Sequence, residues 1–250
     1  MSNDLAHTET YKGFTINIYN DNHPHETPRD WDNLGTMICW HRNYNLGDKH
    51  NYKDSEDFVR DLVGDDYWEA STEQEERELC KVKGDIFSKE FQAAQNEISK
   101  KYSNYRLNKL YENYELLPLY LYDHSGITMN TSGYHCPWDS GQVGWIYISK
   151  EKIRKEYKVK RISKKLMEKV RQALIQEVET YDEYLRGEIY GYEVLDADGE
   201  HLDSCWGFYG YEVKEEDWYV LQEARAAADY AEKKKFPLFA KAGILGENYV

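Results

Sequence analysis

The sequence predicts an α+β fold in which helices pack on one side of an antiparallel or mixed β-sheet. Strand-like segments follow one another along the chain instead of alternating one for one with helices, which favours hairpin-type pairing. Apolar residues make up 40% and charged residues 31% of the 250 residues, which is typical of a chain that buries a core. We expect a flexible N-terminus at 1–10 and a single domain at 11–250, with 54–115 as a candidate acidic helical insertion.

The strands are predicted from apolar alternation and from short continuous apolar runs. Residues 13–19 place three large apolar side chains on one face, which is the two-residue period of a half-buried strand. Residues 36–41 are apolar on both faces, as in a central strand. Further strands are predicted at 117–122, 143–148, 188–195 and 200–208, and a turn at 196–199 joins the last two into a hairpin.

The helices are predicted from capping residues followed by apolar positions three and four residues apart. Asp54 or Ser55 can cap a short helix, because a side-chain oxygen there can accept an unpaired backbone N–H. Residues 72–102 predict a long acidic helical region, with Gly84 as a candidate break. Two further amphipathic helices are predicted to start after Ser163 and at Asp217.

The net charge of −14 is unevenly distributed along the chain. Residues 54–90 contain thirteen acidic and five basic residues, 150–171 contain three acidic and eleven basic residues, and 177–217 contain fourteen acidic and two basic residues. Blocks of like charge decide which partners a protein attracts. The basic block could hold a phosphate, but we do not expect direct nucleic-acid binding, because the flanking acidic blocks repel a polyanion.

Several classes of protein are excluded by what the sequence lacks. No segment approaches the ~20 consecutive apolar residues of a membrane-spanning helix, and residues 1–10 have no signal-peptide pattern. The four scattered cysteines form no C-x-x-C pair, which favours reduced thiols, and we expect a cytoplasmic protein with no membrane partner. Common nucleotide-binding and metalloenzyme motifs are absent, so we expect no cofactor.

Two groups of residues have side chains suited to catalysis. His41, Arg42 and Asp48 follow the strand predicted at 36–41 and could position a phosphate, with Arg42 as a donor fork and His41 as a proton carrier. The alternative is a structural rim in which these side chains pair with neighbours. The spacing of these three residues matches no known catalytic motif.

The second group lies in a long loop at 123–142 that contains His124, Cys136 and Asp139. Together these residues supply a thiol, an imidazole and a carboxylate, which are the types needed for nucleophilic catalysis. The alternative is a turn in which Asp139 bonds the local backbone. We expect no metal site, because neither His124, His135, Cys136 and Asp139 nor His23 and His25 have the paired spacing of zinc ligands.

The acidic blocks predict a protein-binding face. Carboxylates interleaved with tyrosines can compete with nucleic acid for a basic groove, since charge speeds the encounter and aromatic rings anchor the contact. The alternative is that acidity only maintains solubility. The residues expected to bind a partner are Asp57, Asp61, Asp65, Asp66, Glu73, Glu76, Tyr190, Tyr192, Asp196, Asp198, Tyr209 and Tyr211.

Two segments carry a resemblance to known sequences. G-T-M-I-C-W-H-R-N-Y-N-L-G-D-K-H at 35–50, and D-H-S-G at 123–126 with W-D-S-G-Q-V-G-W-I-Y at 138–147, resemble uncharacterised proteins of bacteriophages and mobile genetic elements. Small acidic accessory proteins of such elements often antagonise host restriction or CRISPR systems. The resemblance therefore implies an anti-defence role in the host-cell cytoplasm, but no catalytic residue.

The leading hypothesis is a non-enzymatic inhibitor that binds a host defence nuclease or CRISPR nucleoprotein through an acidic, tyrosine-rich face. The alternative is an enzyme that acts on a phosphate-containing or nucleic-acid substrate, with His41, Arg42, Asp48, His124, Asp139 and Cys136 in one cleft. A third reading is a phage structural or assembly factor.

Overall fold

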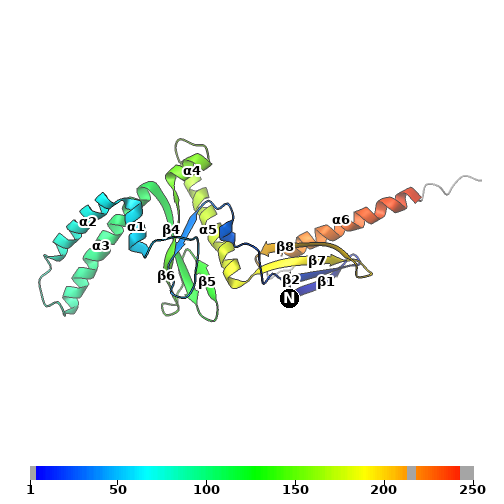
Figure 1. Cartoon of the computed structure of the whole chain (residues 1–250), viewed down its shortest axis with the longest axis horizontal. Helices are drawn as coiled ribbons and strands as arrows, with labels where there is room; N and C mark the ends of the chain where they lie inside the picture. Colours follow the sequence, from blue (N-terminus) through cyan, green and yellow to red (C-terminus); the bar gives the residue numbers. More distant parts are fainter. Residues whose placement is uncertain (1–3, 213–217, 243–250) are drawn as a thin grey trace, which may run out of the picture. The chain divides into compact units, whose positions relative to one another are not determined.

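The computed structural model describes residues 4–212 and 218–242, with the backbone alone from 235 onward. This part of the chain contains six α-helices and two four-stranded antiparallel sheets, which confirms the α+β class (Figure 1). The chain divides into two compact units, although a single domain was expected. The first unit comprises the described residues up to Trp31, Gly126–Thr128 and those from Glu179 onward; the second comprises Asp32–Ser125 and Met129–Val178.

The first unit is built on a sheet with strand order β1-β2-β7-β8. Its elements are β1 Leu5–Tyr11, β2 Phe14–Asn20, the 3-10 helix η1 Pro28–Asp30, β7 Ile189–Leu195, β8 His201–Tyr209 and α6 Tyr219–Ala242. The predicted hairpin is present as β7 and β8. Asp196 shapes its turn, because one carboxylate oxygen accepts the backbone N–H groups of Asp198 and Glu200, both at 3.0 Å.

Strand β1 occupies residues that the sequence led us to expect as a flexible end. It pairs antiparallel with β2 across a tight turn at Lys12 and Gly13, both at positive φ. The sequence pattern missed it because β1 has polar residues on both faces. Glu9 pairs with Arg225 of α6, and His7 lies edge-on to Trp218, so its inward-facing groups find partners more than 200 residues away.

The core of the first unit lies between its sheet and α6. The predicted alternation in β2 holds, and Phe14, Ile16 and Ile18 are all buried. Trp218, which directly precedes α6, and Leu221 of α6 are buried in this core. The expected cap Asp217 lies outside the described residues, and α6 continues past Pro237 to Ala242.

The second unit is built on a sheet with strand order β3-β6-β4-β5. Its strands are β3 Thr36–Cys39, β4 Tyr114–Asp123, β5 Ile127–Asn130 and β6 Ser140–Ser149. Residues 126–128, at the start of β5, belong to the first unit. The three strands expected here are present as β3, β4 and β6. The long loop at 123–142 contains an additional short strand, β5, which pattern reading missed because only four residues are extended.

Five helices start in the second unit, namely α1 Ser55–Val63, α2 Asp65–Leu79, α3 Lys89–Asn113, α4 Lys150–Glu156 and α5 Lys164–Arg186. Asp54 caps α1 as predicted, because its carboxylate accepts the N–H of Asp57 at 2.9 Å. The acidic helical region expected at 72–102 is formed by α2 and α3, and the candidate break at Gly84 lies within an interruption that extends over residues 80–88. The stripe predicted for α5 is buried at Val170, Leu174 and Val178.

Close approach of β3 and β6 requires a glycine at Gly144. A Cβ built there would lie 2.0 Å from the backbone oxygen of Ile38, whereas a Cβ on Gly141 of the same strand would meet nothing within 4 Å. We expect Gly144→Ala to lower the free energy of unfolding by about 1–3 kcal/mol through overpacking. Urea denaturation measures this loss. Gly141→Ala is the matched control, and an equal loss in both variants would contradict the explanation.

The Glu9–Arg225 pair predicts a pH dependence of the first unit. Two hydrogen bonds of 2.7 and 2.6 Å from Arg225 lower the pKa of Glu9. A carboxylate with a lowered pKa stabilises the fold above its unfolded-state pKa, and this stabilisation is lost as the pH falls through the folded-state pKa. We therefore expect Glu9→Gln to lower the melting temperature at neutral pH and to have little effect in acid. Glu200→Gln, at an exposed turn position, should show no such difference between the two pH values.

Candidate functional site

The exposed carboxylates of α1 and α2 form what we call the acidic helical surface. Its members are Glu56, Asp57, Asp61, Asp65, Asp66, Glu69, Glu73 and Glu76, all of which are exposed. They include all six acidic residues predicted for a partner-binding role in this region. The two helices contact each other, so these carboxylates lie on neighbouring elements (Figure 1).

Basic residues neutralise only part of this surface. From Ser55 to Leu79 there are ten acidic residues and two arginines. Arg60 pairs with Asp65 at 2.6 Å, and Arg77 pairs with Glu73 at 3.2 Å. Arg106 and Lys101 of α3 pair with Glu75 and Glu78. In the described part of the chain the other eight carboxylates pair only with Arg60 and Arg77, and two guanidinium groups cannot balance eight carboxylates. A negative excess therefore remains on α1 and α2.

The hairpin residues predicted to join this face have mostly structural roles. Tyr190 and Tyr192 are buried in the core against α6, so they cannot anchor a partner in this conformation. They were expected on the binding face because tyrosines are interleaved with carboxylates in this segment, but α6 covers the face of the sheet on which they lie. Asp196 shapes the turn, Tyr209 is half-buried, and burial raises its pKa to about 12. Asp198 and Tyr211 are exposed.

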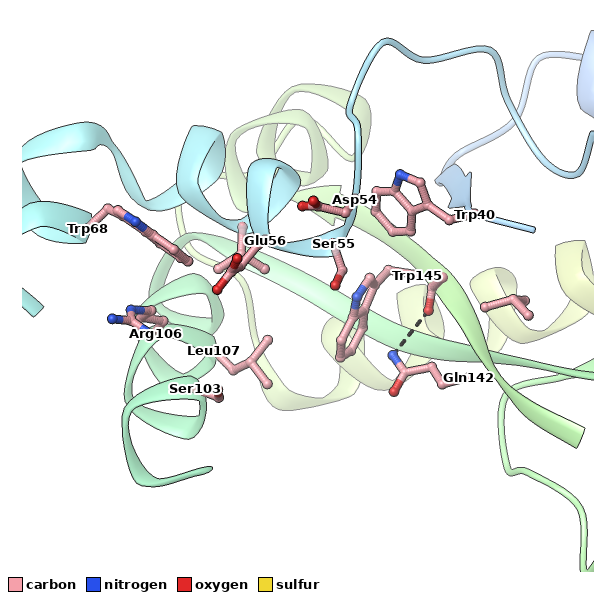
Figure 2. Close-up of a pocket in the computed structure, with 13 residues that line it drawn as sticks. Trp40, Asp54, Ser55, Glu56, Trp68, Ser103, Arg106, Leu107, Gln142 and Trp145 are labelled. Carbon is pink, nitrogen blue, oxygen red and sulfur yellow. Dashed lines mark hydrogen bonds between the residues drawn. The ribbon is translucent and has the colours of Figure 1, made fainter. Parts of the chain in front are cut away.

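A pocket of about 420 Å³ lies beside the acidic helical surface, within the second unit (Figure 2). We call it the tryptophan pocket, because Trp40, Trp68 and Trp145 line it. Its size falls within the range of small-molecule sites. The other lining residues are Asp54, Ser55, Glu56, Val59, Ser103, Arg106, Leu107, Gln142, Val143 and Gly144.

Each tryptophan is placed by a different element. Trp40 follows β3, and its indole N–H donates to the Tyr52 carbonyl at 3.0 Å, so its ring faces rather than its donor are available to a ligand. Trp145 belongs to β6 and Trp68 to α2. Trp40 also packs against Phe58, with ring centroids 6.0 Å apart. The pocket is therefore an aromatic site assembled from distant parts of the sequence.

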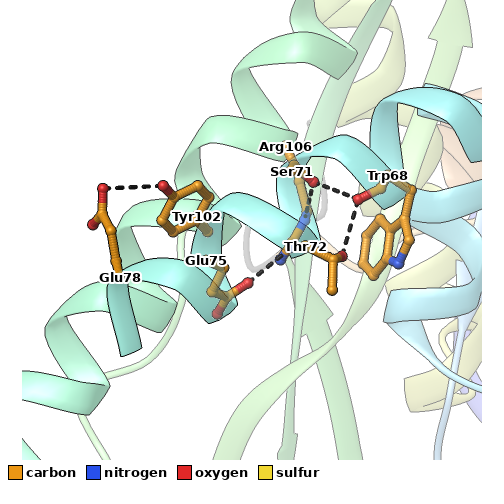
Figure 3. Close-up of polar contacts among 7 residues, drawn as sticks. All are labelled: Trp68, Ser71, Thr72, Glu75, Glu78, Tyr102 and Arg106. Atoms are coloured by element: carbon orange, nitrogen blue, oxygen red, sulfur yellow. Dashed lines mark hydrogen bonds and ion pairs between the residues drawn. The ribbon is translucent and has the colours of Figure 1, made fainter. Parts of the chain in front are cut away.

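Arg106 of α3 connects this helix to α2 through several polar contacts (Figure 3). It is 6% exposed, and its guanidinium lies 4.4 Å from the centroid of the Trp68 ring. Its Nε donates to Ser71 at 2.9 Å, and one terminal nitrogen donates to Thr72 at 3.1 Å and to Glu75 at 2.8 Å. The Glu75 carboxylate thus balances the charge of Arg106 within the protein.

The remaining charges of the tryptophan pocket are negative. Asp54 and Glu56 are exposed at the start of α1, where carboxylates are favoured by the helix dipole. In Figure 2 the Glu56 carboxylate projects toward the space bounded by Trp68, Arg106 and Trp145. Since Arg106 is matched by Glu75, the lining carries a net negative charge.

The alternative catalytic residues His124, Cys136 and Asp139 lie where β4 ends and β6 begins. Asp139 is the centre of this group, because one carboxylate oxygen accepts from the Cys136 thiol at 3.4 Å and lies 3.8 Å from Nδ1 of His124. His41 stacks on Tyr44, whose hydroxyl donates to Asp123 at 3.4 Å. The structure thus brings His124, Cys136 and Asp139 together. It links His41 to the neighbouring Asp123 through the ring and hydroxyl of Tyr44.

The chemistry of this second group is not that of an activated nucleophile. Among the described residues the Cys136 thiol bonds the Asp139 carboxylate and not an imidazole, so it lacks the thiol–imidazole pair by which a base activates a nucleophile. Asp48 is occupied elsewhere, because it accepts the Met37 N–H at 2.8 Å and its own N–H donates to the Met37 carbonyl at 2.7 Å. Arg42 is exposed. The six residues therefore do not share one set of contacts.

The basic block at 150–171 has structural partners. Lys150 donates to the carbonyls of Tyr111 and Glu112 at the end of α3, and Lys152 donates to those of Asn33 and Leu34. Arg171 pairs with Glu115. These contacts satisfy carbonyls and a buried carboxylate, so part of the block serves the fold.

The described residues contain neither a metal-binding cluster nor a membrane-spanning helix. Within residues 4–212 and 218–242 no three His, Cys, Asp or Glu side chains gather closely enough to hold a metal ion. Over the same ranges no helix has the length and apolar content needed to cross a membrane. Comparisons with protein-family models, with curated proteins and with solved structures found no match for this chain.

Sequence reasoning missed the tryptophan pocket. Trp40 lay inside a segment chosen for its His and Arg residues, whereas Trp68, Trp145 and Arg106 were not chosen. A usable signal was present, because Trp68 interrupts an otherwise acidic helix. The convergence of three tryptophans depends on long-range pairing of β3 with β6 and of α2 with α3, which a local pattern does not contain.

The Arg106 network predicts a large stability effect of one substitution. Arg106→Met should lower the free energy of unfolding by about 3–5 kcal/mol, because Glu75 would stay partly buried without its counter-charge. Arg106→Met with Glu75→Met should recover much of this loss, since no unpaired charge remains. Urea denaturation measures both variants. Arg77→Met, which removes an exposed pair, is the control, and an equal loss there would refute the assignment.

Proposed function

We propose that this chain is a non-enzymatic interaction protein that docks its acidic helical surface on a basic, nucleic-acid-binding surface of another protein. The observation that carries the proposal is the excess of exposed carboxylates on the adjacent helices α1 and α2. An anionic surface attracts the lysines and arginines that line a nucleic-acid groove and accelerates the encounter.

The aromatic part of the proposed face comes from the second unit. Tyr67 and Tyr105 stack with centroids 5.5 Å apart beside the acidic helical surface, and Tyr105 is 48% exposed. Tyrosine supplies contact area at low entropic cost, which is why it is common at binding interfaces. These tyrosines take the role that sequence reasoning gave to the hairpin.

The partner class that we propose is a bacterial defence nuclease or CRISPR nucleoprotein, as the resemblance of residues 35–50 and 123–147 to phage and mobile-element proteins implies. Occupation of a basic groove by carboxylates would exclude nucleic acid by direct competition. The mode of action is therefore inhibition without catalysis. An enzyme that uses His124, Cys136 and Asp139 is the second candidate, because the first two side chains both approach the same carboxylate oxygen of Asp139.

Affinity capture from a bacterial lysate tests the docking proposal. The intact chain should retain a basic nucleic-acid-binding protein at low salt and release it at high salt, because ions screen exposed charges. The triple variant Asp66→Lys, Glu73→Lys and Glu76→Lys should lose most of this capture, as measured by quantitative mass spectrometry. Asp66 and Glu76 make no ion pair with any residue that the structure describes, and Glu73 makes only an exposed pair with Arg77, which contributes little to stability, so the variant should stay folded.

The control variant carries the same change in net charge at other exposed acids. Glu97→Lys, Glu151→Lys and Glu156→Lys lie on α3 and α4, outside the acidic helical surface. Equal loss of capture in both triple variants would mean that net charge, and not this surface, recruits the partner. Capture that is insensitive to salt and to both variants would refute the proposal, and the lack of any captured protein would favour the enzyme.

A further inference from the structure

The tryptophan pocket combines aromatic walls with an excess of negative charge. The three indoles alone would suffice to bind a neutral apolar ligand, which would leave Asp54 and Glu56 without a role. An anion would be repelled by these two carboxylates. Arg106 does not reverse this balance, because Ser71, Thr72 and Glu75 already accept its hydrogen bonds. The lining is therefore complementary to an organic cation with a flat or apolar body.

The protein itself contains one example of such a cation in this position. The guanidinium of Arg106 lies 4.4 Å from the Trp68 ring centroid and meets a carboxylate at 2.8 Å. A planar guanidinium can stack on an indole and bond a carboxylate at the same time, which a compact ammonium does less well. The pocket offers the same two partners to a guanidinium group of a ligand. The indoles of Trp40 and Trp145 provide ring faces, and Glu56 provides an exposed carboxylate.

We propose that the tryptophan pocket receives an arginine side chain of the protein partner. The guanidinium lies against the indoles of Trp145 and Trp40 and pairs with Glu56, while the neighbouring acidic helical surface attracts the basic residues around that arginine. The inference rests on the proposed function and deepens it, because it supplies a specific anchor within a surface that otherwise acts through charge. Anchors of this kind, in pockets near an interface centre, dominate binding energy.

Titration of the intact chain with small probes tests the pocket directly. The chain contains seven tryptophans, so 5-fluorotryptophan labelling gives seven fluorine NMR signals, assigned by single Trp→Phe variants. N-acetyl-arginine amide should shift the signals of Trp40, Trp68 and Trp145, with a dissociation constant on the order of millimolar. The signals of Trp31, Trp138, Trp206 and Trp218 serve as internal controls and should stay in place.

Two comparison probes define the chemistry. N-acetyl-citrulline amide has nearly the shape of the arginine probe but no charge, and it should cause little shift at the same concentration. N-acetyl-lysine amide should bind more weakly than the arginine probe, because its ammonium cannot stack as a plane. Equal shifts from the citrulline probe, or shifts spread over all seven signals, would overturn the proposal.

A matched pair of variants locates the charge. Glu56→Gln should weaken binding of the arginine probe by about threefold to fivefold, whereas Glu97→Gln, an equal change on α3 outside both the pocket and the acidic helical surface, should leave it unchanged. Both are exposed positions, and unchanged control signals show that the variants are folded. Equal effects of the two variants would exclude a specific role of Glu56.

The pocket and the docking surface can fail separately. If the intact chain captures a basic protein in a salt-sensitive manner but the arginine probe moves no pocket signal, the anchor is refuted and the docking proposal stands. If the probe binds the pocket but the Asp66, Glu73 and Glu76 variant captures its partner normally, the acidic helical surface is refuted. Because Glu56 belongs to both the pocket and the acidic helical surface, the anchor is supported when the probe binds and Glu56→Gln weakens capture of the same identified protein more than Glu76→Gln, which removes the same charge from the acidic helical surface outside the pocket.

Discussion

The arrangement of the second unit's helices depends on one buried cation. Arg106 reaches from α3 into α2, where it meets two hydroxyls, one carboxylate and the face of Trp68. A buried guanidinium is costly unless all its neighbours are placed to receive it, so this contact fixes α2 against α3 in one register. The same contact orients Trp68 and presents the outer carboxylates of α2. The site and the helical packing therefore share a single determinant.

Much of the fold was predictable because it is encoded by local periodicity. The alternation of β2, the hairpin of β7 and β8, the cap of α1 at Asp54 and the apolar stripe of α5 all follow from neighbouring residues. The failures have a common cause. Strand β1 has polar faces satisfied by α6, and the division into two units depends on which distant segments pair, so neither can be recognised within a short window.

The sequence predicted the negative charge of the candidate site but not the arrangement of its aromatic side chains. Exposed positions of the acidic residues on α1 and α2 follow from composition and helical period. The tyrosines expected beside them were misplaced, because Tyr190 and Tyr192 look like surface residues of a half-exposed strand until α6 covers that face. The tryptophan pocket was invisible to pattern reading, since its three indoles lie on a strand, a loop end and a helix that meet only in the folded unit.

Strand β8 has a further consequence for the state of the molecule in solution. It is the outermost strand of its sheet, and most of its residues are exposed. Two irregularities interrupt its pairing with β7, and Gly207 adopts a positive φ within it. Bulges of this kind increase the local twist and break the straight row of backbone donors and acceptors that an additional strand would need. The irregular edge is therefore a poor template for an additional strand.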